Sequence, residues 1–315
     1  MSIIYFIFLD SASLSLCVLC VLRGKQVLIM YFHTKDNMMK FAGSLSEADK
    51  EKAWYEIIGV PFDSNAFKKG TREGPKAIRK ASQLLETFIW DYKLELSDLL
   101  YYDSGDIILE RNFKKIVELD ITRRKIFIGG DHSISYPLVK ALLKRDEVAK
   151  VIVIDAHADF RDSYKNNTLS NACVMRRIAE LIGFENILQI GVRSSSEAEY
   201  TLIKDRIRIY DAAMLMEKGV DGILNEIGSD SEKTYLSIDI DTLDPGIAPG
   251  VDNPEPCGLS LESLSSLVRG IIKRVNVVAS DVVEVNPKRD NNNGITSINA
   301  SRLIFEILAS YSDNR

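Results

Sequence analysis

The sequence predicts an α/β protein in which a mainly parallel sheet carries helices on both faces, giving three α/β/α layers. From Glu51 onward, short apolar runs alternate with amphipathic stretches, and strands that alternate with helices usually pair in parallel. No repeat, low-complexity tract or linker divides the chain, and 315 residues that are 46% hydrophobic suit one large core. We therefore expect a single α/β domain.

Strands are expected where β-branched and other apolar residues form short continuous runs. In chain order these runs cover residues 55–60, 99–103, 125–128, 151–155, 187–191, 207–210, 234–239 and 275–284. Helices are expected between them, where apolar residues recur at helical spacing. These stretches cover residues 74–85, 112–121, 135–144, 171–182, 197–204, 212–228, 260–273 and 297–310.

The first forty residues stand outside this pattern. Residues 3–22 are mostly apolar, but Asp10 interrupts the run and the first basic residue is Arg23, which is atypical of a signal peptide or a membrane span. We expect residues 1–40 to be an extension upstream of a natural start at Met30, Met38 or Met39, with a membrane anchor as the alternative. The folded domain is then residues 41–315.

Charge and cysteine content narrow the class of protein. The net charge is −5, and Lys and Arg are scattered without a basic stripe, so a nucleic-acid partner is not expected. Four cysteines in a chain of this length do not form a disulfide framework. This composition is typical of a cytoplasmic enzyme.

Carboxylates and histidines gather where three expected strands end. Buried carboxylates repel one another unless cations or protons lie between them, and ligands collect at the carboxyl ends of parallel strands. Two of the chain's three histidines fall in these clusters. Oxygen ligands with two imidazoles favour two Mn²⁺ ions, whereas Zn²⁺ would more often bring cysteine or a third histidine. The six candidate ligands are His132, Asp155, His157, Asp159, Asp239 and Asp241.

Residues beside these clusters are expected to shape the site. Asp131 and Asp244 are interpreted as supporting or turn-forming residues. The pair Gly129-Gly130 is expected to allow a tight turn next to the metals.

In register, these segments resemble the signatures of the ureohydrolases, the family of arginase and agmatinase. The matching segments are Gly-Gly-Asp-His-Ser at 129–133, Asp-Ala-His-Ala-Asp at 155–159 and the Ser-x-Asp-x-Asp-x-x-Asp-Pro pattern at 237–245. Segments 59–63, 70–79 and 281–287 also resemble that family, particularly agmatinases. The resemblance runs from about residue 41 to residue 309.

The resemblance implies an arginase-like fold, a homo-oligomer (trimer or hexamer) and two Mn²⁺ per subunit. His132, Asp155, Asp159 and Asp239 would hold one ion. Asp155, His157, Asp239 and Asp241 would hold the other, so that Asp155 and Asp239 bridge the ions. Water activated by the metals would attack the guanidinium carbon.

Glu284 matches the guanidinium-binding glutamate of that family, and a carboxylate can accept two hydrogen bonds from a planar guanidinium. The expected reaction is hydrolysis of agmatine to putrescine and urea, a step of polyamine biosynthesis. Arginine, guanidino acids and formiminoglutamate remain alternative substrates. Arg161 and Tyr164 are expected at the mouth of the site, with a solvated loop as the alternative.

One position departs from the family pattern. Asn171 stands where the family carries a histidine that is expected to pass a proton to the leaving amine. An amide cannot titrate, so Asp162, Tyr164 or the activated water would have to supply the proton. We expect reduced rather than absent activity. The further alternative is a non-catalytic, metal-stabilised regulatory or binding subunit.

Overall fold

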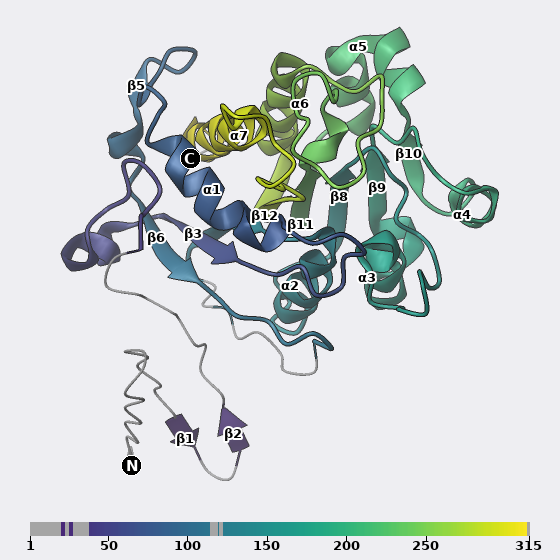
Figure 1. The fold of residues 1–315 in the computed structure, drawn as a ribbon, viewed down its shortest axis with the longest axis horizontal. Coiled ribbons are helices and arrows are strands. Elements are labelled where there is room, and N and C mark those ends of the chain that lie inside the picture. Colours follow the sequence, from purple (N-terminus) through teal and green to yellow (C-terminus); the bar gives the residue numbers. More distant parts are fainter. Residues whose placement is uncertain (1–19, 23–24, 28–37, 114–118, 120–121, 314–315) are drawn as a thin grey trace.

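The computed structural model describes residues 20–22, 25–27, 38–113, 119 and 122–313, and its centre is an eight-stranded sheet (Figure 1). Every neighbouring pair in this sheet is parallel. The spatial order is β10-β9-β8-β11-β12-β7-β3-β6. The strands are β3 (Tyr55–Val60), β6 (Tyr101–Asp106), β7 (Arg124–Gly129), β8 (Lys150–Ile154), β9 (Ile187–Ile190), β10 (Arg208–Tyr210), β11 (Asp230–Asp239) and β12 (Val275–Val283).

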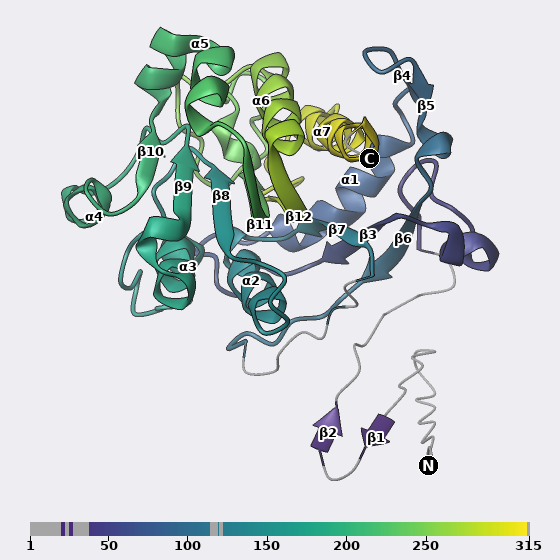
Figure 2. The same cartoon turned by 180° about the vertical axis from the view of Figure 1, so that it is seen from behind.

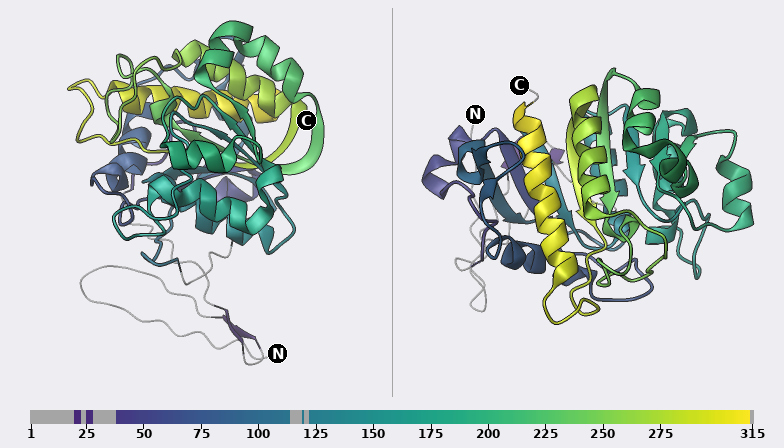
Figure 3. Two further views of the ribbon diagram at one scale, coloured as in Figure 1. Left: turned by 90° about the vertical axis from the view of Figure 1, so that its right-hand side faces the viewer. Right: turned by 90° about the horizontal axis from the view of Figure 1, so that it is seen from above.

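Helices cover both faces of this sheet, as expected (Figures 1 and 2). One layer contains α1 (Gly74–Ser82), α5 (Ala212–Ile227), α6 (Leu261–Arg274) and α7 (Ile295–Asp313), and α7 contacts both α1 and α6 (Figure 3). The opposite layer contains α2 (Ser135–Leu143) and α3 (Val174–Ile182), which contact each other. The short α4 (Glu197–Ile203) lies beyond β10 at the sheet edge.

The central strands are buried on both faces, which is why they read as continuous apolar runs rather than alternating ones. In β8, Ile152 and Ile154 belong to the apolar core beneath α6 and α7. Val151 and Val153 point the other way and belong to the core beneath α2 and α3, as the two-residue period of a strand requires.

The expected helix at 112–121 lies mostly outside the described residues. Two small ribbons were not anticipated, β1 (Cys20–Leu22) with β2 (Lys25–Val27) and β4 (Phe88–Ile89) with β5 (Leu94–Glu95). Short 3₁₀ turns are η1 (Glu47–Lys52), η2 (Thr71–Glu73), η3 (Leu96–Leu99), η4 (His132–Ile134), η5 (Asn171–Cys173), η6 (Phe184–Asn186) and η7 (Ile240–Thr242).

Four strands that are neighbours in the sheet, β8, β11, β12 and β7, end at the same edge. In the sequence, β7 directly precedes β8, yet the later strands β11 and β12 lie between them in the sheet. Chain segments from residue 130 to residue 284 therefore meet at one edge, and the expected ligands either end one of these strands, as Asp239 does, or follow it.

Phe41 is already part of the core, since its side chain is buried and its N–H donates to Asp103 Oδ2 (2.8 Å). No helix in the described part of the chain has both the length and the apolar character needed to cross a membrane.

Candidate metal centre and adjoining cavity

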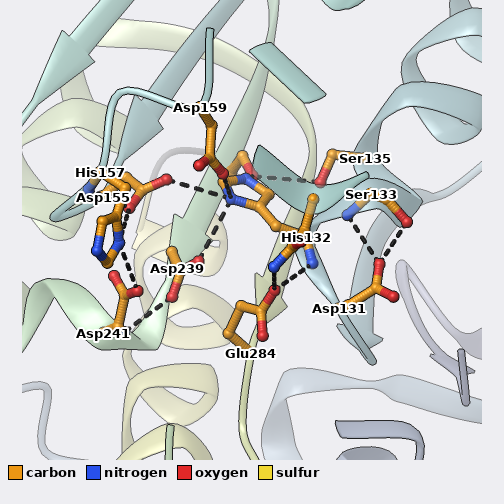
Figure 4. A network of polar contacts seen from close by, with 12 residues as sticks. Asp131, His132, Ser133, Ser135, Asp155, His157, Asp159, Asp239, Asp241 and Glu284 are labelled. Carbon is orange, nitrogen blue, oxygen red and sulfur yellow. Dashed lines mark hydrogen bonds and ion pairs between the residues drawn. The ribbon is translucent and has the colours of Figure 1, made fainter. Parts of the chain in front are cut away.

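The structure brings the six expected ligands together around two points at the carboxyl edge of the sheet. At the first point, His132 Nδ1 faces three carboxylate oxygens (Figure 4). It lies 3.2 Å from Asp155 Oδ2, 3.3 Å from Asp159 Oδ2 and 3.3 Å from Asp239 Oδ2. His132, Asp155 and Asp239 form one group able to hold an ion.

The second point lies around His157 Nδ1, which is 2.9 Å from Asp241 Oδ2 and 3.8 Å from Asp155 Oδ1. Asp155, His157 and Asp241 form the second group able to hold an ion. Asp155 therefore directs one oxygen to each group, which is the arrangement of a bridging ligand. Asp239 belongs to the first group, and its Oδ1 accepts the N–H of Asp241 (2.9 Å).

The buried charges of this cluster shift the pKa values of its members. Burial, followed by the charges of Asp241 and Asp159, raises the pKa of Asp155 to about 7. For His157, burial lowers the pKa, but the hydrogen bond and charge of Asp241 outweigh it and raise the pKa to about 11. Without cations, the cluster is thus stabilised by retained protons.

The donor atoms fit a pair of divalent cations. His132 Nδ1 and Asp155 Oδ2 are buried, and neither has a hydrogen-bond partner in the described chain. Leaving such atoms unpaired is costly unless another group binds them. Four carboxylates and two imidazoles are a donor set that suits Mn²⁺.

A polar chain behind His132 fixes which ring nitrogen faces the cluster. Ser237 Oγ donates to Asp281 Oδ1 (2.7 Å), so it can accept the N–H of His132 Nε2 (3.0 Å). Asp281 also accepts from the hydroxyls of Ser135 (2.6 Å) and Tyr235 (2.7 Å). Nδ1 of His132 is then the nitrogen directed at the three carboxylates, where its lone pair could bind a metal ion, as in many metal sites.

Local backbone geometry aims two of the carboxylates. Asp159 and Glu284 have φ angles of 55° and 67°, in the left-handed region that costs a non-glycine residue about 1–3 kcal/mol. The cost is offset by contacts of the surrounding chain: the carbonyl of Asp159 accepts the N–H of Met175 (3.1 Å), and the N–H of Glu284 donates to the carbonyl of Gly130 (2.9 Å).

The expected role of Gly129-Gly130 needs correction. Neither glycine has a positive φ, so the turn does not use their conformational freedom. Gly130 is required instead by a close approach, because a Cβ there would lie 1.7 Å from the carbonyl oxygen of Phe62. That carbonyl accepts the N–H of Asp131 (2.7 Å).

Asp131 and Asp244 shape turns, as expected. Asp131 accepts the N–H groups of Ser133 (3.0 Å) and Ala66 (2.9 Å). Asp244 accepts the N–H groups of Gly246 (2.9 Å) and Gly258 (3.2 Å). These bonds hold the loops that follow β7 and β11.

Glu284 lies beside the first metal group, at the end of β12. Its Oε1 accepts the N–H of His132 (2.8 Å) and Nδ2 of Asn171 (2.9 Å), and its Oε2 is buried with no hydrogen-bond partner in the described chain. Burial, followed by the charges of Asp131 and Asp252, raises the pKa of Glu284 well above its usual value. A cation bound next to this carboxylate would therefore stabilise its charged form.

A cavity of about 280 Å³ opens in front of these groups, and several expected residues line it. Asn171 and Glu284 lie along it with Asp159, His157, Asp239 and Asp241. Arg161 and Tyr164 also line it, and the Arg161 guanidinium lies 5.5 Å from the Tyr164 ring centre. Asp162 is not among the lining residues and pairs with Arg176 and Arg177.

The sequence prediction missed other lining residues, including Lys68, Ser194, Glu199, Asp252 and Asn253. Lys68, Ser194, Asp252 and Asn253 come from loops after β3, β9 and β11, where no period or motif singles out one polar residue. Glu199 lies in the first turn of α4, where its spacing from Ser196 is that of a helix-capping pair. For Asp252 and Asn253, the flanking Gly250 and Pro254 signalled only a turn.

Known proteins resemble this chain over most of its length. The model of the arginase family matches residues 54–310. The chain is similar to an agmatinase of Pyrococcus horikoshii, with 33% identity over 280 residues that cover 85% of this chain and 95% of that protein. It is also similar to an N(1)-aminopropylagmatine ureohydrolase of Thermococcus kodakarensis, with 32% identity covering 82% and 90% of the two chains. The solved agmatine ureohydrolase of Thermoplasma volcanium superposes with a TM-score of 0.76 and 29% identity, covering 88% of this chain and 95% of that one.

Proposed function

Because this chain belongs to the arginase family, we propose that it hydrolyses the guanidino group of agmatine to give putrescine and urea. The observation that carries the proposal is the cavity, in which two groups of metal-ligating side chains lie beside a buried, unpaired carboxylate oxygen of Glu284. Hydrolysis of a guanidino group needs activated water and an anion that holds the guanidinium, and this cavity contains candidates for both.

We propose that two Mn²⁺ ions bind per chain, one at His132, Asp155, Asp159 and Asp239 and one at Asp155, His157, Asp239 and Asp241. Bound there, they would supply the positive charge that makes water nucleophilic near neutral pH. The Asp239→Ala variant is expected to lose metal content and activity together, since it removes a ligand proposed for both ions. Full metal content by elemental analysis with full turnover would show that the ligand assignment is wrong.

Glu284 is the residue that binds and orients the substrate in this proposal. Its Oε2 can accept a guanidinium N–H, and the positive charge of the guanidinium would compensate the buried negative charge of the Glu284 carboxylate. Because Glu284 extends from the end of β12 and is held through Oε1, its free Oε2 has a fixed position relative to the metal groups.

Asn171 leaves the proposed reaction without a general acid at this position. Its amide cannot supply a proton to the leaving amine, and the structure uses it to hold Glu284. Asp162 is engaged elsewhere with arginines, so Tyr164 and the activated water remain as proton sources. A missing general acid typically costs about 10²–10⁴-fold in rate, so we expect slow turnover.

A guanidino acid is a second candidate substrate, and the mouth of the cavity favours it. Lys68 and Arg161 both line the cavity, and their cationic groups would attract a carboxylate tail and repel the ammonium of agmatine. Arg161 is only partly offset by Glu199, whose Oε2 lies 3.5 Å away.

Urea release tests the proposal directly. The Mn²⁺-reconstituted protein and its metal-free form are compared for urea release from agmatine, arginine and guanidinobutyrate, and for formamide release from formiminoglutamate. Metal-dependent urea from agmatine supports the primary proposal, and a preference for guanidinobutyrate supports the second. Absence of urea from every guanidine, with two metals bound per chain, would refute both and favour a non-catalytic subunit.

We further propose that residues 41–315 form the functional domain of a cytoplasmic homo-oligomer, a trimer or hexamer, as the family resemblance implies. Sedimentation of the purified protein measures the oligomeric state, and a monomer at working concentration would contradict it.

A further inference from the structure

Glu284 has only one oxygen left for a substrate. Its Oε1 already accepts two hydrogen bonds, from the N–H of His132 and from Nδ2 of Asn171. A guanidinium that approaches it therefore meets one free acceptor, Oε2, rather than the two that a bidentate pair requires. The cavity needs a second acceptor if the guanidinium is to be held in a defined plane.

Asp252 provides an acceptor with the same character. It lines the same cavity, it is 3% exposed, and its Oδ2 is buried with no hydrogen-bond partner in the described chain. Its other oxygen, Oδ1, accepts Nδ2 of Asn286 (2.6 Å) and lies 3.2 Å from Nε of Arg289. One oxygen is thus fixed by neighbours while the other is left free.

The side chain that holds Asp252, Asn286, is closely packed. The N–H of Asn286 donates to the carbonyl of Gly250 (2.7 Å), and a Cβ at Gly70 would lie 2.2 Å from Asn286 Oδ1. Asn286 also follows Glu284 by two residues, so the same strand end holds both carboxylates. Rotation of either carboxylate would break the hydrogen bonds that hold its first oxygen.

The neighbouring lysine does not satisfy the free oxygen. Lys68 Nζ donates to the backbone carbonyl of Asp252 and to Asn253 Oδ1 (3.3 Å). Its ammonium is therefore bound to other acceptors in the same loop. Asp252 and Glu284 line the same cavity, and the negative charge of Asp252 is one of the causes that raise the pKa of Glu284.

We propose that Asp252 Oδ2 and Glu284 Oε2 together bind the substrate guanidinium, each accepting an N–H from a different nitrogen. Asp252 is then a substrate-positioning residue, and the inference rests on the proposed guanidino-hydrolase function. A planar cation with several N–H donors fits between two single acceptors. Its positive charge would also relieve the repulsion between them.

The test is the Asp252→Asn variant, which keeps the size of the side chain but removes its charge. The variant and wild type, both loaded with Mn²⁺, are compared for kcat and KM on agmatine and for the Kd of guanidinium ion by calorimetry. We expect KM and Kd to rise about 10- to 100-fold, as for loss of a charge-assisted hydrogen bond. We expect kcat to change less and the metal content to stay at that of wild type.

The control is Arg289→Gln, which removes the ion pair at Oδ1 but leaves Oδ2 of Asp252 in place. Guanidinium affinity within about two-fold of wild type is expected. An equal loss of affinity in this control would indicate a structural effect and overturn the proposal. A raised KM of Asp252→Asn for agmatine with an unchanged Kd for guanidinium would place Asp252 at the substrate tail and overturn the proposal. Unchanged values of both KM and Kd would overturn it as well.

Failure of the proposed function is distinguishable from failure of this inference. If wild type binds guanidinium but releases no urea from any guanidine, the proposed reaction is wrong. Guanidinium binding that depends on Asp252 would then still support the two-carboxylate site. If wild type binds no guanidinium, the inference is wrong whatever the urea assay shows.

Discussion

Replacing Asp155 with asparagine is expected to stabilise the metal-free protein while abolishing its response to Mn²⁺. Asp155 is fully buried between the two candidate metal groups, and burial with the charges of Asp241 and Asp159 raises its pKa from 3.8 to about 7. Asparagine keeps the shape and an acceptor for the N–H of His157, which Asp155 Oδ1 binds at 2.7 Å. It removes only the ionisable oxygen.

The magnitude follows from linkage between protonation and folding. Below pH 3.8 Asp155 is protonated in both the folded and the unfolded chain. Between pH 3.8 and about 7 the folded chain retains a proton that the unfolded chain has lost, so the free energy of unfolding falls as pH rises. A pKa difference of about three corresponds to roughly 4 kcal/mol. Above pH 7 this whole contribution is lost.

The assay is urea denaturation of EDTA-treated wild type and Asp155→Asn at pH 4, 6 and 8. We expect the two proteins to be similar at pH 4 and the variant to be more stable at pH 8, by up to about 4 kcal/mol. Because the pKa of His157 is raised, the free energy of unfolding also falls as pH rises above 6.5. This fall occurs in both proteins. Excess Mn²⁺ should stabilise wild type at pH 8 and leave the variant unaffected.

Two results would refute this reasoning. One is a metal-free variant that is no more stable than wild type at pH 8, and the other is an advantage that does not depend on pH. Asp162→Asn is the matched control, since Asp162 is an exposed carboxylate outside the cavity lining. Its stability should follow wild type at every pH.

Two further predictions concern the residues around His132 and Glu284. Ser237→Ala removes the acceptor that orients His132 Nε2, so Mn²⁺ affinity should fall about 10- to 100-fold; titration of metal-free protein measures it, and unchanged affinity would show that the tautomer is held otherwise. Asn171→His restores a group that can donate a proton, so kcat on agmatine should rise, by up to about 10²-fold. Asn171→Gln, which keeps a non-titrating amide, should show no rise in kcat. Turnover by Asn171→His at or below that of wild type would contradict the claim that a missing proton donor at this position slows the reaction.

The sequence predicted the sheet and its helices closely where apolar runs are continuous. β3 matches its expected bounds of 55–60, and β8 differs by one residue at each end. Continuous runs mark strands that are covered on both faces, so the signal and the physical cause coincide. The ribbon of β4 and β5 was missed because strands of two residues have no measurable period.

The clustering of these carboxylates with histidine could be predicted because they follow buried strands that end at one edge of a parallel sheet. That the cluster holds metal ions stays a prediction. What could not be predicted is how each carboxylate uses its two oxygens. On the sequence alone, Asn171 is only a residue that cannot donate a proton to the leaving amine. In the structure its amide Nδ2 donates a hydrogen bond to Oε1 of Glu284. Asp252 carries no signal in its turn-rich segment, and only its burial and its one unpaired oxygen single it out.

The order of strands in the sheet also has a consequence for folding during synthesis. β7 and β8 emerge early, but they cannot pair because the places between them belong to β11 and β12, which are made last. His132 and Asp155 therefore remain in separate half-sheets until residues 230–283 are available. Closure of the sheet depends on these contacts between distant parts of the chain, which form slowly. The two candidate metal groups are therefore complete only when β11 has joined the sheet, because Asp239 ends β11 and Asp241 lies in the turn that follows it.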